Sequence, residues 1–162
     1  MAEFILVSLL SYGFPAYFNL EQEFNASVII EQSNTLGEDP YFMVALAWVE
    51  SRLKSRAVSH TGDYGIFQVN YSFWGKHWGY KSRKKFLKDM SNIKHATVAA
   101  TTVLHEMRKY TACQGLNLPA CYNGGPSWQK SKNREKIMSY AAKVNRMRMI
   151  FRARSSNWVE LH

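Results

Sequence analysis

The stretch from residue 39 to residue 53 constrains the fold more than any other part of the chain. As a helix it would be apolar on nearly every side. Its apolar residues are Phe42, Val44, Ala45, Leu46, Trp48, Val49 and Leu53. Asp39 is suited to cap the start of this helix, and Pro40 fits its first position. Because a helix that is apolar on most sides is covered by other elements, we expect it in the middle of a single domain.

The neighbouring sequence predicts further helices. One begins at Asn19, where Gln22 completes a capping box, and ends at Gly37. Two more are expected at about residues 92–110 and 133–151, because each of these segments has one apolar face.

The segments between these helices have other compositions. From Ser59 to Gly79 the glycines, aromatic residues and β-branched residues predict turns with a short strand or hairpin. The segment from Cys113 to Pro126 is rich in Gly and Pro, which predicts a loop. The expected fold class is therefore mostly α (α+β), a single domain with a small β-hairpin-like insert after the central helix.

Glu50 is the one carboxyl group in the apolar part of the central helix, directly after Leu46–Val49. Burial raises the pKa of a carboxyl group and keeps it protonated near neutral pH, which is the state that a general acid needs. The alternative is an exposed Glu50 that pairs with Arg52 or Lys54.

Asp63 lies between Gly62 and Gly65 in the turn-rich segment. A carboxyl group with a raised pKa and a second, more solvated carboxylate are the arrangement used for glycoside cleavage. Gln68 and Asn70 alternate along an extended run after this turn, so their side chains can point the same way. The alternative is a purely structural Gly-Asp-Tyr-Gly turn.

Three motifs, in this order, resemble those of the lytic transglycosylases with a lysozyme-like (soluble lytic transglycosylase) domain. They are Glu50-Ser51, Gly62-x-x-Gly65-Ile66-Phe67-Gln68 and Tyr122-Asn123-Gly124, where the family has Glu-Ser, Gly-x-x-Gly-Leu-x-Gln and Ala-Tyr-Asn-x-Gly. The resemblance covers about residues 38–145 and is closest in pattern to the small conjugation-, secretion- and phage-associated members. It implies a lysozyme-like fold and cleavage of the glycan strands of bacterial peptidoglycan.

The resemblance also implies a role for each matching residue. Glu50 would protonate the glycosidic oxygen of the β-1,4 bond between N-acetylmuramic acid (MurNAc) and N-acetylglucosamine (GlcNAc). It would then deprotonate the muramoyl 6-hydroxyl, which closes a 1,6-anhydro ring without water. Ser51 would bind the substrate or orient the site, and Gln68 would contact the sugar. Tyr122 would hold Glu50 through its hydroxyl, and Asn123 would position the same wall of the cleft.

Two positions depart from the family pattern. Cys121 stands where the family has Ala, and Cys121 and Cys113 can either form a disulfide or remain buried thiols. Asp63 matches the second carboxylate of animal-type lysozymes, so the same fold could act as a muramidase, a hydrolase that uses Glu50 and Asp63. The Tyr-Asn-Gly motif belongs to the transglycosylases and not to the animal lysozymes, which favours the lyase.

The aromatic residues that follow Asn70 have two interpretations. Tyr71, Phe73, Trp74 and Trp78 are either core residues or a platform on which sugar rings stack. The histidines show no metal-ligand spacing, and the chain has neither a CxxC pair nor a phosphate-binding glycine loop. We therefore expect no metal and no cofactor.

The chain is strongly basic, with 21 Lys and Arg against 12 Asp and Glu and a net charge of +9. The excess is concentrated between Lys76 and Lys88 and between Lys130 and Arg154. Peptidoglycan stems and associated wall polymers are acidic, so this charge suits a peptidoglycan-binding enzyme. A nucleic-acid binder could carry the same charge, but no nucleic-acid-binding motif supports one, and we expect no nucleic-acid partner.

The chain divides into an apolar N-terminal arm (1–18), the lysozyme-like domain (19–151) and a C-terminal tail (152–162). The arm has Glu3 near its start and no small-residue cleavage site, so we expect neither a cleaved signal peptide nor a membrane span. The expected location is a phage virion or the bacterial periplasm and cell envelope, with virion or secretion-complex proteins bound through the arm. The remaining alternative is a structural virion or assembly component with a latent site.

Overall fold

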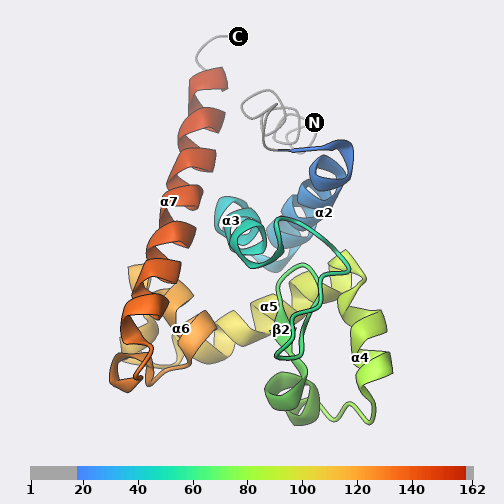
Figure 1. Ribbon diagram of the computed structural model, residues 1–162. Helices are drawn as coiled ribbons and strands as arrows, with labels where there is room; N and C mark the ends of the chain where they lie inside the picture. Colours follow the sequence, from blue (N-terminus) through green and yellow to red (C-terminus); the bar gives the residue numbers. More distant parts are fainter. Residues whose placement is uncertain (1–17, 160–162) are drawn as a thin grey trace.

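The computed structural model describes residues 18–159, so the predicted arm lies outside the described residues except for Phe18. About seven-tenths of the described residues are helical (Figure 1). The main helices are α2 (Leu20–Leu36), α3 (Pro40–Ser51), α4 (Arg83–Met90), α5 (Ile93–Arg108), α6 (Leu118–Gly124) and α7 (Arg134–Val159). Two short strands, β1 (Asp63–Tyr64) and β2 (Val69–Asn70), form the only sheet within the described range. The mostly α fold with a small hairpin is confirmed.

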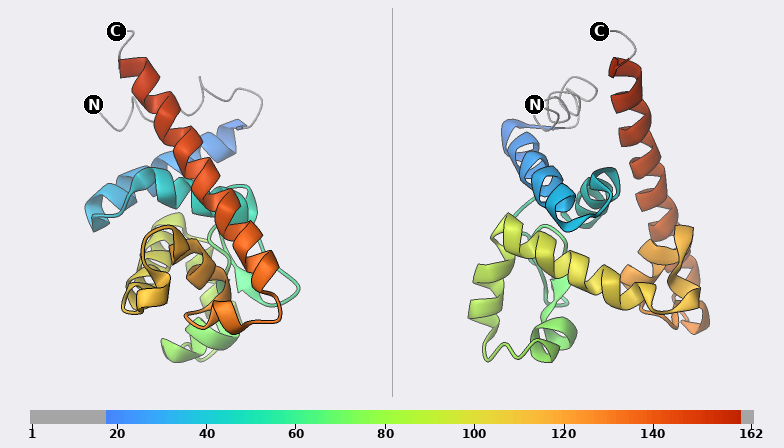
Figure 2. Two further views of the ribbon diagram at one scale, coloured as in Figure 1. Left: turned by 90° about the vertical axis from the view of Figure 1, so that its left-hand side faces the viewer. Right: turned by 180° about the vertical axis from the view of Figure 1, so that it is seen from behind.

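The predicted central helix is α3, and every residue from Phe42 to Trp48 is buried. Asp39 caps it by accepting hydrogen bonds from the backbone N–H groups of Tyr41 and Phe42, and Pro40 occupies the first turn. Helix α3 lies between α2 and α7, while α5 crosses below it and reaches from α4 to α6 (Figure 2). The apolar sides of α3 are therefore covered by other elements from several directions, as the sequence predicts.

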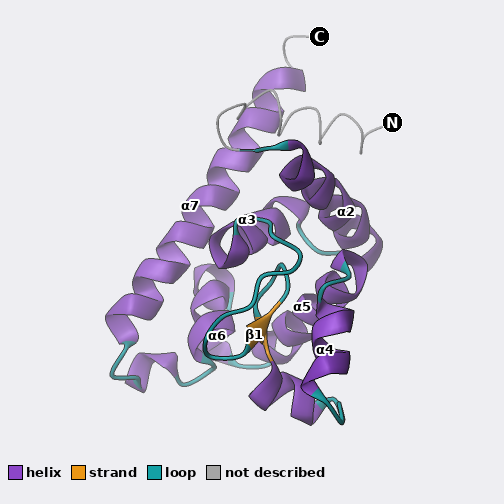
Figure 3. Ribbon diagram, turned by 45° about the vertical axis from the view of Figure 1, so that its right-hand side comes forward, coloured by secondary structure: helices purple, strands orange, loops and turns teal. Residues whose placement is uncertain are grey.

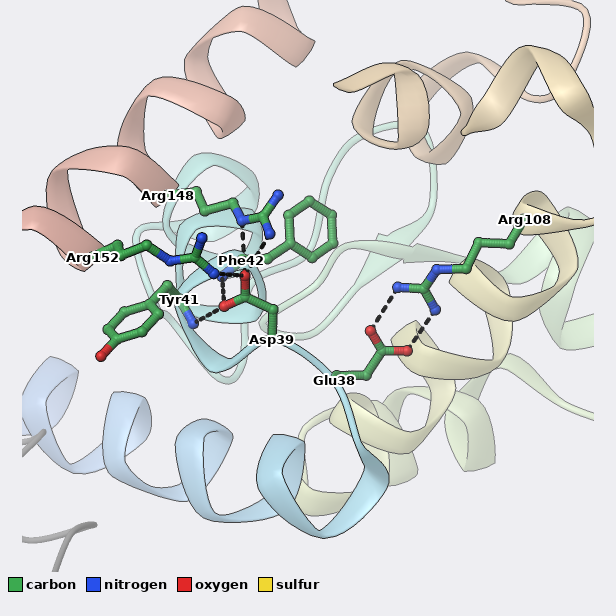
Figure 4. A network of polar contacts seen from close by, with 7 residues as sticks. All are labelled: Glu38, Asp39, Tyr41, Phe42, Arg108, Arg148 and Arg152. Carbon is green, nitrogen blue, oxygen red and sulfur yellow. Dashed lines mark hydrogen bonds and ion pairs between the residues drawn. The ribbon is translucent and has the colours of Figure 1, made fainter. Parts of the chain in front are cut away.

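Two neighbouring acids fasten the start of α3 to two different helices (Figure 4). Asp39 Oδ2 lies 2.6 Å from Arg148 and 2.8 Å from Arg152, both on α7. The side chain of Glu38 is only 3% exposed and receives two hydrogen bonds of 2.7 Å from the guanidinium of Arg108 on α5. Paired, charge-assisted bonds of this kind fix geometry as well as adding energy.

Helix α2 holds the other end of α3. Its capping box at Asn19 and Gln22 and its stop at Gly37 are both as predicted. The side-chain amide of Asn25 donates to the carbonyl oxygen of Leu53 at 2.7 Å, and that of Gln22 donates to Arg52 at 2.9 Å. These bonds satisfy carbonyl groups just beyond the end of α3, which a helix end otherwise leaves without partners.

The hairpin packs against the end of α4 through Gly65 (Figure 3). The strands are antiparallel, with Asp63 opposite Asn70. Gly65 has a φ of +77°, and a Cβ at this position would lie 2.2 Å from the carbonyl oxygen of Met90. Glycine is required here both by the backbone conformation and by the close approach of the α4 backbone.

Three local predictions were wrong. The segment predicted as a loop from Cys113 to Pro126 contains α6, because a proline is tolerated in a first turn and the buried face of α6 packs against α7. Gln68 does not lie on an extended run, since its φ of +50° places it in the turn before β2. Helix α7 extends to Val159, past the predicted end at residue 151.

Candidate active site

One cleft of about 620 Å³ brings together residues from three parts of the chain. Helix α3, the hairpin and the end of α6 each contribute to its walls. Of the candidate catalytic and substrate-binding residues, those that line it are Glu50, Asp63, Gln68, Asn70, Tyr122 and Asn123. Segments more than 70 residues apart in sequence therefore meet at one surface, which a set of chance motifs would not do.

Glu50 occupies the last full turn of α3, with its side chain at the cleft. Burial raises the pKa of its carboxyl group, a hydrogen bond from Tyr140 lowers it, and the nearby charge of Asp63 raises it; the result is a pKa of about 7. Glu50 is thus about half protonated at neutral pH and largely protonated below it, and burial raises its pKa as the sequence predicts. It makes no ion pair with Arg52, whose guanidinium lies 4.8 Å from the centre of the Trp48 ring.

Tyr140, on α7, contacts Glu50 and is a candidate site residue that the motifs do not reveal. Its hydroxyl donates a hydrogen bond to Glu50 Oε1. Burial and the Glu50 carboxyl raise the pKa of Tyr140 well above 10, so the phenol keeps its proton and acts as a donor. A signal was present in the sequence, because Tyr140 lies three residues after Ile137 and four before Val144, on the buried face of α7.

Tyr122 does not hold Glu50, contrary to the sequence-based expectation. Its hydroxyl donates to the carbonyl oxygen of Phe67 at 2.8 Å and so fastens α6 to the hairpin turn. Tyr122 still lines the cleft, and the charge of Glu50 contributes to its raised pKa. Its role here is to hold the two walls of the cleft together.

Asp63 is held as a carboxylate by the side chains around it. Partial burial acts to raise its pKa, but hydrogen bonds from Ser59, Thr61 and Asn70 lower it below the ordinary value. The three donors lie 2.6, 2.6 and 2.7 Å from its oxygens. The cleft therefore contains one carboxyl group with a raised pKa and one with a lowered pKa, which separates a proton donor from a fixed negative charge.

Ser51 and Gln68 bond mainly to the protein. Ser51 is buried, and its hydroxyl donates to the carbonyl oxygen of Ile66 at 2.7 Å, which joins the end of α3 to the hairpin. The Gln68 amide donates to the carbonyl oxygens of Gly65 and Ala57 at 2.9 and 3.2 Å. Asn123 is exposed at the cleft rim. Ser51 therefore connects the end of α3 with the hairpin, whereas Asn123 is exposed at the rim, where a ligand could reach it.

A family model describes most of the chain. The model for the transglycosylase SLT domain matches residues 27–145, which include Glu50, the hairpin, α6 and Tyr140. The chain belongs to the transglycosylase SLT domain family. Members of this family are lytic transglycosylases that act on peptidoglycan, so the chain is an enzyme of the cell wall. No curated protein and no solved structure gave a significant match.

The cleft of this SLT domain has an aromatic end. Phe73, which is 64% exposed, and Trp74 line the cleft, whereas Tyr71 is buried against Phe86 in the core. Of the two interpretations of this cluster, core packing thus holds for Tyr71, whereas Phe73 and Trp74 place aromatic side chains in the wall of the cleft. Such faces suit pyranose rings.

The SLT domain joins α6 to the preceding turn by a disulfide between Cys113 and Cys121. Cys121 itself lines the cleft, directly before Tyr122. Among residues 18–159 no group of three or more His, Cys, Asp or Glu side chains is arranged to hold a metal ion. Over the same range no helix is long and apolar enough to cross a membrane.

Proposed function

We propose that Glu50 is the single general acid and base of a lytic transglycosylase that cleaves the MurNAc–GlcNAc β-1,4 bond. The observation that carries the proposal is the buried Glu50 carboxyl at the wall of a cleft of about 620 Å³, where it accepts a hydrogen bond from Tyr140 and has a pKa raised to about 7. A carboxyl group with a pKa of about 7 can give up a proton and take one back at neutral pH.

The reaction balances with one residue. Glu50 donates its proton to the glycosidic oxygen as the bond from that oxygen to C1 of MurNAc breaks, and GlcNAc leaves with a free 4-hydroxyl. The positive charge at C1 is stabilised by the acetamido group of MurNAc and by the Asp63 carboxylate. The 6-hydroxyl of the same MurNAc attacks C1, and ionised Glu50 removes its proton. The products carry a 1,6-anhydro end, and Glu50 is restored.

The other cleft residues support this sequence. Gln68 and Asn70 shape the wall on which Asp63 is held, and Asn70 donates to Asp63 itself. Asn123 faces the sugar from the rim, and Tyr122 keeps α6 against the hairpin turn. Ser51 acts indirectly, because its hydrogen bond to the Ile66 carbonyl oxygen fixes the end of the helix that carries Glu50.

The alternative function is a muramidase, because an ionised Asp63 in the same cleft could stabilise or trap the cation until water attacks. Mass spectrometry of the muropeptides released from purified peptidoglycan separates the two. We expect products lighter by one water with 1,6-anhydro ends, and no products from Glu50→Gln. Reducing ends would establish the muramidase instead, and full activity of Glu50→Gln would exclude both mechanisms.

We also propose a setting for this activity, in which the enzyme opens the wall locally as part of a phage particle or a secretion apparatus. The apolar run Phe4–Leu10 in the arm before the catalytic domain (19–151) supports attachment to a partner protein. The net charge of +9 supports contact with an acidic wall. Mass spectrometry of purified virions or secretion complexes from the producing cells should detect the chain there, and its presence only as free protein would contradict this setting.

A further inference from the structure

Two hollows lie side by side on the surface beyond the aromatic end of the cleft. They have volumes of about 490 and 400 Å³, and both are lined by Trp78, Tyr80 and Asp89. The first is completed by residues of α5, and the second by residues at the start of α4. We call the surface formed by Trp78, Tyr80, Lys81 and Lys85 the tryptophan face. None of these four residues takes part in the proposed reaction.

An aromatic pair connects this face with the cleft. Trp74 lines the cleft and Trp78 lines both hollows, and their ring centres lie 5.5 Å apart at an interplanar angle of 30°. Phe73 continues the series, with its ring centre 4.9 Å from that of Trp74. Aromatic surface therefore extends from the catalytic cleft to the tryptophan face, so a chain of sugars bound in the cleft could continue along it.

Tyr80 is held in place within this face. Its ring packs edge-on against buried Phe86 at 5.0 Å, and its hydroxyl donates to Asp89 at 2.9 Å. Lys85 also bonds to Asp89 at 3.1 Å, so the one acid of the face is already neutralised by the protein. A face with its side chains fixed in advance loses less entropy on binding a ligand.

The charge around the face indicates an anionic ligand. Residues 76–89 contain six Lys and Arg against the single acid Asp89. The basic residues Lys76, Lys81, Arg83, Lys84, Lys85 and Lys88 are all exposed. A ligand that suits this surface has flat or ring-shaped apolar faces and carboxylates, which describes a glycan strand with acidic peptide stems.

We propose that the tryptophan face binds a second stretch of the peptidoglycan strand, beyond the part held in the cleft. Trp78 would stack on a sugar ring, and Lys81 would contact a carboxylate of the peptide stems. The inference extends the proposed function and rests on it. Continuity with the cleft favours peptidoglycan over a nucleic acid, which would be attracted by the charge alone.

The test measures binding to insoluble purified peptidoglycan by co-sedimentation. Every protein in the test also carries the Glu50→Gln substitution, so that the peptidoglycan is not cleaved. Trp78→Leu should weaken binding about tenfold, and Lys81→Gln about threefold. Lys81 is exposed, so its variant keeps the test readable if Trp78→Leu does not fold, which a melting curve reports. The matched control is Lys132→Gln, an exposed lysine at another hollow, before α7. It should bind as Glu50→Gln alone does.

Three results would overturn the proposal. Equal losses of peptidoglycan binding in Lys81→Gln and Lys132→Gln would show that the effect comes from the net charge alone. Unchanged binding in folded Trp78→Leu and in Lys81→Gln would leave the face without a ligand. In a parallel filter-binding measurement with double-stranded DNA, a loss of DNA binding in these variants without a loss of peptidoglycan binding would assign the face to nucleic acid. Because cleavage is not measured, failure of the proposed reaction would appear separately, in the muropeptide products of the native enzyme.

Discussion

The hydroxyl of Tyr140 donates a hydrogen bond to Glu50 across a separation of 90 residues in sequence. At the other end of α3, Asp39 is bonded by Arg148 and Arg152 of the same α7. Helices α3 and α7 are therefore antiparallel and fastened at two points, which lie about 16 Å apart along α3 at a rise of 1.5 Å per residue. The register of these two helices therefore places the Tyr140 hydroxyl at the Glu50 carboxyl group.

Removal of the Tyr140 hydroxyl should change the pH dependence of cleavage. In the native enzyme, kcat/KM should fall as the pH rises above about 7, because the required proton on Glu50 is lost. The Tyr140 hydrogen bond lowers the pKa of Glu50, so Tyr140→Phe should move this fall to higher pH. It should also reduce kcat by about tenfold, because the carboxyl group is less well oriented.

Tyr122→Phe is the matched control for that variant. It removes a hydroxyl from the same cleft, but one that is bonded to the Phe67 carbonyl oxygen. We expect a loss of stability with the fall in kcat/KM still centred near pH 7. If Tyr122→Phe shifted the profile and Tyr140→Phe did not, the assignment of the two tyrosines would be reversed.

Glu50→Gln should stabilise the protein at alkaline pH. The pKa of Glu50 is about 7 in the folded protein against 4.5 for the free side chain, so the folded state binds a proton that the unfolded state has lost. Native stability therefore decreases as pH rises from about 4.5 to 7 and stays lower above it. At pH 8 the variant should gain up to about 3 kcal/mol in the free energy of unfolding.

Denaturant unfolding at two pH values checks this prediction. The difference between Glu50→Gln and the native protein should be large at pH 8 and close to zero at pH 4. An equal difference at both pH values would mean that the effect comes from packing, with no contribution from the buried charge.

Asp39→Asn should loosen one of the two connections between α3 and α7. Asparagine caps a helix as well as aspartate does, so the variant removes the ion pairs with Arg148 and Arg152 and retains the cap. Since these groups are partly exposed, the cost should be about 1 kcal/mol of unfolding free energy. The fall in kcat/KM should shift to higher pH, by less than in Tyr140→Phe.

Glu38→Gln separates this effect from a general loss of stability. Glu38 is bonded to Arg108 on α5, which does not carry Tyr140, and it is more deeply buried than Asp39. We expect a larger cost, about 2 kcal/mol, with an unshifted pH profile. Equal shifts in both variants would show that the register of α3 and α7 is not what places Tyr140.

Gly65→Ala should disrupt the packing of the hairpin against the end of α4. An added Cβ would lie 2.2 Å from the Met90 carbonyl oxygen at a backbone φ of +77°, so we expect a loss of about 3 kcal/mol and of most activity. Gly62→Ala is the comparison, because its φ is +88° but no heavy atom lies within 4 Å of its added Cβ. It should cost only about 1 kcal/mol. Thermal unfolding of both variants measures the difference.

The parts of the structure that depend on neighbouring residues could be predicted from the sequence. The caps at Asn19 and Asp39 are local hydrogen bonds, and the burial of Glu50 follows from the apolar helix that carries it. The raised pKa of Glu50 could therefore be predicted from its position. The hairpin could be predicted too, because its glycines favour turns and its aromatic and β-branched residues favour strands.

The parts of the structure that depend on contacts between distant residues could not be predicted from the sequence. Nothing near Tyr140 in sequence indicates that its hydroxyl reaches Glu50, and the family motif assigned that role to Tyr122. Helix α6 was predicted as a loop because Gly and Pro outweigh helix formers locally, whereas burial against α7 decides the structure. Ser51 likewise has its partner, the Ile66 carbonyl oxygen, on another element.

The Cys113–Cys121 disulfide would make the rigidity of this cleft wall depend on the redox state around the chain. In a reducing cytoplasm the two thiols would stay apart, and the short helix that presents Tyr122 would be less firmly anchored to the turn before it. In an oxidising compartment the bond would close and hold the wall of the cleft in place. Full activity would then depend on an oxidising environment as well as on the substrate.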